Sequence, residues 1–405
     1  EERQRLLQQA TKAMRELSRV IEAHLEPSVA KAVASKRPGH IAFLTACLRW
    51  PDLTQAAGYV QGFPIIGEIP SSGLFRQLLP AGERDLGHTP EDEFFGQAAI
   101  TAINELESRK PSRDAEAIWN CVSATVEKGT ASEPRTRDFF DSLYGVGKWR
   151  PMPTLLVTQG CGKQRVINDG RAGGHNDWSE MLETIFTISV DILATAAFTI
   201  LDEVRKTWTD LVQDAPLTQL SAAMPEWAEL SFGLDDIPDA YNGVPVWPPH
   251  ARANIISLWC PERSQWMYVA RQGLGFVLTS AVPTFCRSPA LAVAAARRIR
   301  GAVTGAYYDD CPAIETVAEA GTGQLSLQGI LRFTGTDSSE EKSVIPAPSR
   351  VFLGTACQLG TAVSEGRVEF SPKTITISKI RDGCCVRSTR ALPPSEANTD
   401  GLGRF

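Results

Sequence analysis

The sequence predicts an α+β fold with an antiparallel sheet, and three observations lead to this class. Short apolar strands follow one another between residues 153 and 168 and between 228 and 270. Two later strands are expected at 302–308 and 350–355, after helical stretches. The order of these elements is not that of a doubly wound sheet, and the sequence contains neither repeats nor a P-loop. With 405 residues, 43% of them hydrophobic and 22% charged, the chain can form two or three domains with a sizeable core.

The N-terminal third of the chain predicts helices. Apolar residues at helical spacing in 1–33 give an amphipathic pattern that ends near Pro27, and further helices are expected at 91–110 and 114–128. A stretch rich in glycine and proline at 62–73 predicts an ordered loop. Nothing here indicates chemistry, and we expect part of this region to pack against the domain that follows it.

A β-hairpin is predicted next, because PTLLVT and KQRVIN flank the glycine turn QGCG. A long apolar helix is expected from about Ser179 to Val212. Its most apolar run, 184–201, carries Asp191 and several hydroxyl groups, so we interpret it as a buried helix and not as a membrane span.

The remaining elements lead to an acidic turn. The strand AELSFGL runs into DDIPDAY, and two short strands, NIISLW and QWMYVA, follow it. A helix at 279–302 then leads into the strand that ends in Tyr307 and Tyr308. A helical stretch around 313–332 and a final strand, RVFLGT, complete the order.

Three aspartates close these strands. Asp236 ends one apolar strand, while Asp309 and Asp310 lie in the turn after another. Adjacent carboxylates repel each other unless a cation lies between them, and neighbouring antiparallel strands would bring all three together. Such a set suits two Mg²⁺ ions that clamp a triphosphate, which indicates phosphoryl or nucleotidyl transfer. Any one of them taken alone would also suit a turn or helix cap.

The charge distribution permits a polyanionic partner although the net charge is −6. Residues 148–171 contain five basic residues and one acid, and residues 371–390 contain the same numbers. Basic surfaces of this kind can hold a nucleic acid, although each could also be a solvated face. Nine scattered cysteines lack zinc-site spacing and favour a reducing compartment. No signal peptide is visible and the first residue is not Met, so we expect an intracellular protein, in the cytoplasm or nucleus, cut from a longer polypeptide.

These motifs together resemble the reverse transcriptases of retroelements. Tyr307-Tyr308-Asp309-Asp310 matches the Tyr-x-Asp-Asp box of that family, and LDDIPDAYNGVPV (234–246) matches the box of its first catalytic aspartate. GKQRVINDGRAGGHN (162–176) looks like its fingers hairpin. Glu341-Lys342-Ser343 and RVFLGT resemble the closing segment of the palm and the primer grip. The likeness spans about 147–405.

The resemblance implies a polymerase right hand with fingers, an antiparallel-sheet palm and the start of a thumb, preceded by a helical region. The expected boundaries are 1–140 for the helical region, 141–227 for the fingers, 228–355 for the palm and 356–405 for the thumb or connection. The implied activity is RNA-directed DNA synthesis from dNTPs on a primed RNA or DNA template, with two Mg²⁺ ions that Mn²⁺ could replace. The implied context is a retroelement polyprotein without a membrane partner.

The resemblance also assigns roles to single residues. The catalytic set is Asp236, Asp309, Asp310 and Lys342; the metal ligands are Asp236, the Ile237 carbonyl, Asp309 and, more weakly, Asp310; the nucleotide contacts are Lys163, Arg165, Ile237, Tyr241 and Gln272; the primer grip is Phe352, Leu353 and Gly354. Arg165 would hold the β- and γ-phosphates with help from Lys163. Lys342 would protonate the leaving pyrophosphate, or be an ordinary solvated lysine. Gln272 would contact the new base pair or its sugar.

Three features keep alternatives open. An aromatic ring at Tyr241 would exclude a 2′-hydroxyl and favours dNTPs, although it could also only fill the core. Phe276-Val277-Leu278 stands where the family has Phe-Gly-Leu, and Thr158 or Gln159 stands where it has a basic residue. The alternatives are therefore a decayed or co-opted relic that binds nucleic acid and, less favoured by Tyr241, an RNA-directed RNA polymerase.

Overall fold

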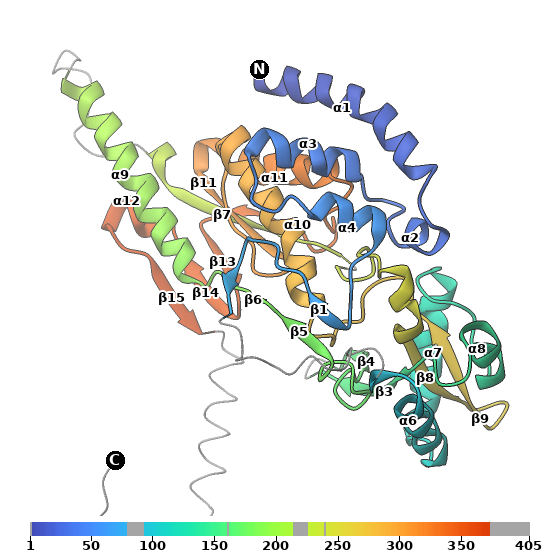
Figure 1. Ribbon diagram of the computed structural model, residues 1–405. Coiled ribbons are helices and arrows are strands. Elements are labelled where there is room, and N and C mark those ends of the chain that lie inside the picture. Colours follow the sequence, from blue (N-terminus) through green and yellow to red (C-terminus); the bar gives the residue numbers. More distant parts are fainter. Residues whose placement is uncertain (1, 79–92, 160–161, 214–225, 239, 373–405) are drawn as a thin grey trace, which may run out of the picture.

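A four-stranded antiparallel sheet forms the centre of the molecule (Figure 1). The computed structural model describes residues 2–78, 93–159, 162–213, 226–238 and 240–372. The strands lie in the order β10 (Val303–Thr304), β11 (Asp310–Thr316), β7 (Leu230–Asp236) and β12 (Val344–Ala347). Along β7, Leu230, Phe232 and Leu234 face one side, and Asp235 faces the other, as the two-residue period of a strand requires. The two faces therefore bury different partners.

Two helices cover the face of the sheet to which Asp235 points. They are α10 (Ala281–Ala295) and α11 (Thr322–Phe333), and they pack against each other as well as against the sheet. Their apolar residues belong to the largest core of the described chain, which also includes Ile41, Leu44 and Tyr59 from the N-terminal helices. α10 continues as a short π-helix at 296–300 before the chain enters β10. The strands β7 and β11 thus rest on a helical support.

The opposite face carries a second apolar cluster. Leu193 and Leu201 of α9 (Asp191–Gln213) meet Phe232, Ile314 and Phe352 there. This cluster also joins the small sheet of β13 (Ser349–Phe352), β14 (Thr355–Gln358) and β15 (Glu369–Pro372), with the short helix α12 (Thr361–Glu365) beside it. Figure 1 shows α9 and this sheet together at one side of the central sheet.

A second four-stranded sheet contains the predicted hairpin. Its order is β4 (Gln164–Asn168), β3 (Pro151–Thr158), β8 (Ile255–Cys260) and β9 (Gln265–Ala270), with β3 and β8 parallel and the other pairs antiparallel. Helix α7 (Ala115–Glu127) packs on it, and α6 (Gln97–Ser108) and α8 (Arg137–Tyr144) enclose a third core with Phe140, Trp149 and Tyr268. β8 and β9, which the sequence analysis assigned to the palm, therefore share a sheet with the hairpin that it assigned to the fingers.

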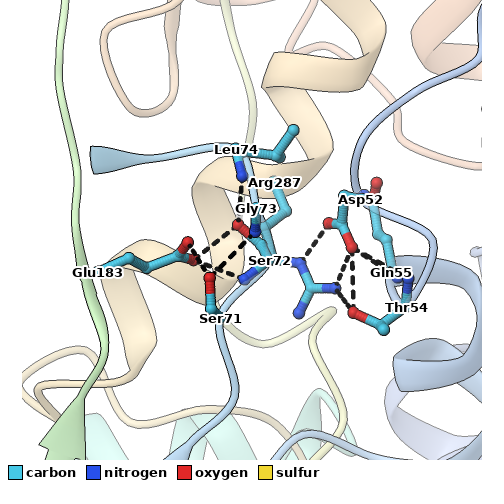
Figure 2. A network of polar contacts seen from close by, with 9 residues as sticks. All are labelled: Asp52, Thr54, Gln55, Ser71, Ser72, Gly73, Leu74, Glu183 and Arg287. Carbon is cyan, nitrogen blue, oxygen red and sulfur yellow. Dashed lines mark hydrogen bonds and ion pairs between the residues drawn. The ribbon is translucent and has the colours of Figure 1, made fainter. Parts of the chain in front are cut away.

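The N-terminal helices attach to the back of α10. They are α1 (Glu2–Glu22), α2 (Pro27–Ala32), α3 (Pro38–Leu48) and α4 (Gln55–Gln61). Between α3 and α4, Asp52 forms a buried two-point ion pair with Arg287 of α10 at 2.6 and 2.7 Å (Figure 2). Beside it, Glu183 accepts hydrogen bonds from Ser71 and Ser72.

Two short strand pairs join the segment before α9 to this region. They are β1 (Gly67–Ile69) with β5 (Ser179–Met181), in parallel, and β2 (Arg76–Gln77) with β6 (Glu183–Thr184), antiparallel. The predicted helix from Ser179 is therefore wrong over its first twelve residues, because this stretch pairs with strands more than 100 residues earlier. The helix itself begins at Asp191.

Other expectations have mixed outcomes. The hairpin, the helix at 114–128, the strands β7, β8 and β9 and the helix at 279–302 are confirmed. The helix expected over 313–332 is wrong at its start, because 310–316 is strand β11 and α11 begins only at Thr322. The strand expected at 302–308 is regular only in β10, and the helix expected over 1–33 is divided into α1 and α2. Most of the predicted thumb, from 373 onward, lies outside the described residues. None of the helices within the described ranges has the length and apolar character needed to cross a membrane.

The buried imidazole of His175 gives a prediction about acid stability. Its Nε2 lies 2.8 Å from the Ala253 carbonyl, its ring meets that of Phe94, and burial lowers the pKa of His175 to about 4. The unfolded chain takes up this proton near pH 6.5, so stability is lost as the pH falls from there toward 4. We expect the free energy of unfolding of the His175→Gln variant to fall less between pH 7 and pH 5, by about 2 kcal/mol. Equal losses in urea titrations of the two proteins would contradict this role.

Candidate active site at the ends of strands β7 and β11

The acidic turn is a tight two-residue connection. Backbone hydrogen bonds join Tyr307 and Asp310 in both directions, at 2.8 and 3.0 Å, so Tyr308 and Asp309 occupy the two central positions. Tyr308 has a φ of 53°, in the left-handed region that a non-glycine residue rarely adopts. Strain of this kind persists where the surrounding structure enforces it, which is frequent at functional sites. The turn therefore presents Asp309 in a fixed and uncommon geometry.

The register of the sheet brings the three predicted carboxylates together. Asp310 of β11 lies directly opposite Asp236 of β7, and the Ile237 N–H donates to the Asp309 carbonyl at 3.0 Å. The preceding acid, Asp235, points to the other face, where it is buried and its Oδ1 accepts hydrogen bonds from the side chains of three residues: Gln324, Gln328 and Ser343. Asp235 therefore belongs to the helical support and not to the site.

The carboxylates of the site carry more negative charge than their surroundings favour. Burial, and then the charge of Asp236, raises the pKa of Asp309, while Lys342 and Arg165 oppose the increase. Burial, and then the charges of Asp309 and Asp236, raises the pKa of Asp310. Because each carboxylate makes its neighbour harder to ionise, this edge of the sheet favours a cation.

Lys342 supplies one such cation. Its Nζ lies 2.6 Å from Asp236 Oδ2, and the turn that carries it is held at the end of β7 by a hydrogen bond from the Ser339 N–H to the Asp236 carbonyl at 2.9 Å. The Lys342 side chain is 57% exposed, so this pair contributes little to stability and can exchange for another partner. The structure thus places the predicted Lys342 against the predicted Asp236.

The donor set fits magnesium chemically. Carboxylate oxygens and a backbone carbonyl are the ligands that Mg²⁺ prefers, and burial, followed by the neighbouring carboxylates, raises the pKa of both Asp309 and Asp310. Among the described residues, no three or more His, Cys, Asp or Glu side chains gather into a set that could hold a metal ion as they stand. The metal role of Asp236, Ile237, Asp309 and Asp310 stays a prediction.

A pocket of about 490 Å³ opens beside the carboxylates. The lining residues include six that the sequence predicted: Lys163, Arg165, Ile237, Tyr241, Asp309 and Lys342. The hairpin β3–β4 supplies the first two, and the ends of β7 and β11 supply Ile237 and Asp309. A larger hollow of about 680 Å³ lies between α1 and α11, away from the carboxylates. The smaller pocket is the one that borders the acidic turn.

Tyr241 forms part of the pocket wall and also packs on aromatic residues. Its ring centroid lies 5.2 Å from those of both Phe276 and Phe285, and burial raises the pKa of its hydroxyl well above the usual range. The two roles that the sequence left open for Tyr241 are thus compatible, because the same ring packs on α10 and borders the pocket.

Gln272 and the primer-grip residues do not line this pocket. Gln272 lines an adjoining hollow of about 270 Å³ that includes Lys31 and Lys128, and Phe276 lies beside Tyr241. Phe352 is buried in the second apolar cluster, on the same side of β7 as Phe232. Leu353 and Gly354, with φ of 49° and 76°, form the turn between β13 and β14. The roles of Gln272 and of the primer-grip residues stay predictions.

The Val277 departure has no torsional consequence. Among the described residues, the non-glycine positions with positive φ do not include Val277, so its β-branched side chain is accommodated without strain. Its carbonyl accepts a hydrogen bond from Asn176 Nδ2 at 3.0 Å. A tight contact within the chain occurs nearby at Gly273, where an added Cβ would lie 2.2 Å from the Asn242 carbonyl oxygen.

Sequence reasoning assigned no role to several pocket residues, including one aromatic and two polar ones. Phe276, Arg271 and Asn242 all line the pocket of the carboxylates. In the sequence, Arg271 is a basic residue directly after an apolar strand. This pattern is also typical of a strand that ends at the solvent, so it does not indicate a binding site. Asn242 gave no signal beyond its position next to Tyr241.

Comparison with known proteins adds little. No family model and no curated protein matches the chain. A solved structure that it is similar to is the protease-reverse transcriptase of a foamy virus in complex with an RNA/DNA hybrid, at 14% sequence identity and a TM-score of 0.44. The match covers 68% of this chain and 29% of that protein, so the chain spans less than a third of its length. A likeness of this degree carries no argument about activity.

Proposed function

We propose that the protein is a template-directed nucleotidyltransferase that copies RNA into DNA from dNTPs, as part of a retroelement polyprotein. The observation that carries the proposal is the pairing of Asp310 with Asp236 beside Asp309, next to a pocket with a cationic wall. Crowded carboxylates that favour a cation, and basic side chains within the same hollow, suit a nucleoside triphosphate and two divalent ions.

Each residue has a defined task in this proposal. Asp236 and Asp309, with the Ile237 carbonyl, would hold Mg²⁺, and Asp310 would act as an outer ligand. The bound metal supplies a lowered pKa for the attacking 3′-hydroxyl and charge stabilisation for the leaving pyrophosphate.

The basic residues act on the phosphates. The guanidinium of Arg165 would bind the β- and γ-phosphates through two nitrogens. Lys163 lines the same pocket and would assist it. Lys342 would leave Asp236 and donate its proton to the leaving group, and its exposed position permits this movement.

The choice of sugar gives a prediction for Tyr241. Replacing Tyr241 with valine removes the ring from the pocket wall and opens space beneath the ribose. We expect the ratio of kcat/KM for rNTP to that for dNTP to rise by about tenfold or more, because the steric exclusion of the 2′-hydroxyl is lost. Tyr241→Phe keeps the ring and should leave the ratio unchanged. If the valine variant also leaves it unchanged, Tyr241 serves only the packing on Phe276 and Phe285.

A primer-extension assay tests the proposed function itself. RNA and DNA templates with an annealed primer are each offered dNTPs or rNTPs with Mg²⁺, and extension on RNA with dNTPs is the expected result. Extension with rNTPs alone would favour an RNA-directed RNA polymerase. A folded protein that binds the duplex and extends nothing would favour the relic.

A further inference from the structure

Arg271 is a partly buried cation, and no acid among the described residues forms an ion pair with it. It follows β9, and its backbone is fixed by Asn254, which accepts from the Arg271 N–H at 2.9 Å and donates to the Arg271 carbonyl. Its Nη2 donates to Asn242 Oδ1 at 2.8 Å, while its Nε is buried without a partner in the described part of the chain. Burial lowers the pKa of Arg271 to about 10, and no charged neighbour opposes that change.

Arg287, the buried arginine of α10, is better matched. It binds both oxygens of Asp52 through Nε and Nη2. A guanidinium stays protonated at neutral pH, so burying one without an acid costs stability. Such a cost is expected where the charge has a ligand to bind.

The pair of side chains offers only hydrogen-bond donors. A guanidinium cannot accept, so Asn242 must turn its Oδ1 toward Arg271 and present its Nδ2 donors elsewhere. Both residues line the pocket of the carboxylates. A surface of donors complements an oxygen that only accepts, as a phosphate oxygen does, whereas a sugar hydroxyl also needs an acceptor.

The pair is also held rigidly. The missing side chain at Gly273 lets the backbone pass within contact distance of Asn242, and Asn254 Nδ2, on a fully buried residue, donates to the Gly273 carbonyl at 2.9 Å. Arg271 therefore reaches the pocket from the end of β9, where its backbone is held in place. Lys163 and Arg165 reach it from the exposed hairpin β3–β4. A preorganised donor binds its ligand with little loss of side-chain entropy.

We propose that Arg271 and Asn242 form an anion-binding pair that takes a phosphate oxygen of the substrate in the pocket of the carboxylates. The phosphate belongs either to the triphosphate of the incoming nucleotide or to the phosphodiester backbone of the bound strand. That choice of ligand rests on the proposed function.

Equilibrium binding to three probes tests the pair: inorganic tripolyphosphate, a dNTP, and a primer–template duplex without nucleotide. We expect Arg271→Met to weaken the binding of tripolyphosphate and dNTP by about tenfold to a hundredfold, and to raise the thermal midpoint of the free protein. Arg271→Lys keeps the charge and should lose less. Arg263→Met, at an exposed position in the turn between β8 and β9, is the control and should bind all three probes as the wild type does.

The results distinguish a triphosphate from a strand phosphate as the ligand, and the anion-binding pair from the proposed polymerase function. A loss confined to the duplex assigns the pair to the strand backbone, and a loss confined to tripolyphosphate and dNTP assigns it to the triphosphate. Unchanged affinity for all three probes in Arg271→Met overturns the anion-binding pair, whatever the thermal midpoint, and leaves primer extension by the wild type untouched. The protein could also bind tripolyphosphate through Arg271 and yet extend no primer. That result would support the anion-binding pair and contradict the proposed function.

Discussion

Asp309→Asn is expected to abolish nucleotide addition, with a loss of roughly a thousandfold or more in kcat, because an amide cannot replace a carboxylate as a ligand to a catalytic cation. The fold should not suffer. Burial and the charge of Asp236 raise the pKa of Asp309, so its ionised form is disfavoured in the folded state. A raised carboxyl pKa costs stability at neutral pH, and this cost disappears as the pH falls through it. In metal-free buffer at pH 7 the variant should therefore melt at the same or a higher temperature than the wild type.

The control for this change is Asp138→Asn, which removes an exposed carboxylate on α8, distant in the fold from the acidic turn. It should leave both the rate of addition and the melting temperature unchanged. Wild-type activity in Asp309→Asn would remove Asp309 from the catalytic set. Loss of activity together with a much lower melting temperature would indicate a structural role instead.

The second large effect concerns stability and comes from the ion pair in Figure 2. Asp52 is fully buried and the side chain of Arg287 is 8% exposed, and Arg287 also donates to Thr54 Oγ1 at 2.7 Å. Asp52→Ala leaves a buried guanidinium without its acid, so we expect the free energy of unfolding to fall by about 3–5 kcal/mol. Urea titration measures the loss.

Two controls sharpen this prediction. Replacing both partners, in Asp52→Leu with Arg287→Met, should recover much of the loss, because an apolar pair of similar volume avoids the unpaired charge. Glu16→Ala breaks the exposed pair with Arg19 and should change stability by less than about 0.5 kcal/mol. A loss below about 1 kcal/mol in Asp52→Ala would show that the pair does not hold α10 against the N-terminal helices.

This anchor also bears on the pocket. Tyr241 packs on Phe285, which lies in α10 two residues before Arg287. Loosening α10 should therefore displace the Tyr241 ring and raise the KM for nucleotides before the protein unfolds. The N-terminal region, for which the sequence indicated no chemistry, acts in this way as a support for the pocket wall.

The carboxylate edge could be predicted because local rules determine it. The apolar strand before Asp236 and the turn chemistry around Asp309 can be recognised within a few residues, and antiparallel pairing then brings the strand ends together. The strand after the turn could not be recognised, because the apolar run 311–314 is too short for its pattern to distinguish a strand from a helix.

Contacts between distant segments explain the other differences. The segment before α9 pairs with β1 and β2, and nothing within 179–184 itself reports those partners. Arg271 and Asn242 meet across 29 residues of sequence.

The most direct test of the proposed site is the addition of a single nucleotide to a DNA primer on an RNA template, with each of the four dNTPs offered separately. The account predicts that the wild type adds only the dNTP complementary to the next template base, that addition requires Mg²⁺, and that Asp309→Asn adds none. If folded wild-type protein binds the primed template but adds no nucleotide at any template base, or if Asp309→Asn adds nucleotides as fast as the wild type, the carboxylates at the ends of β7 and β11 are not a nucleotidyl-transfer site.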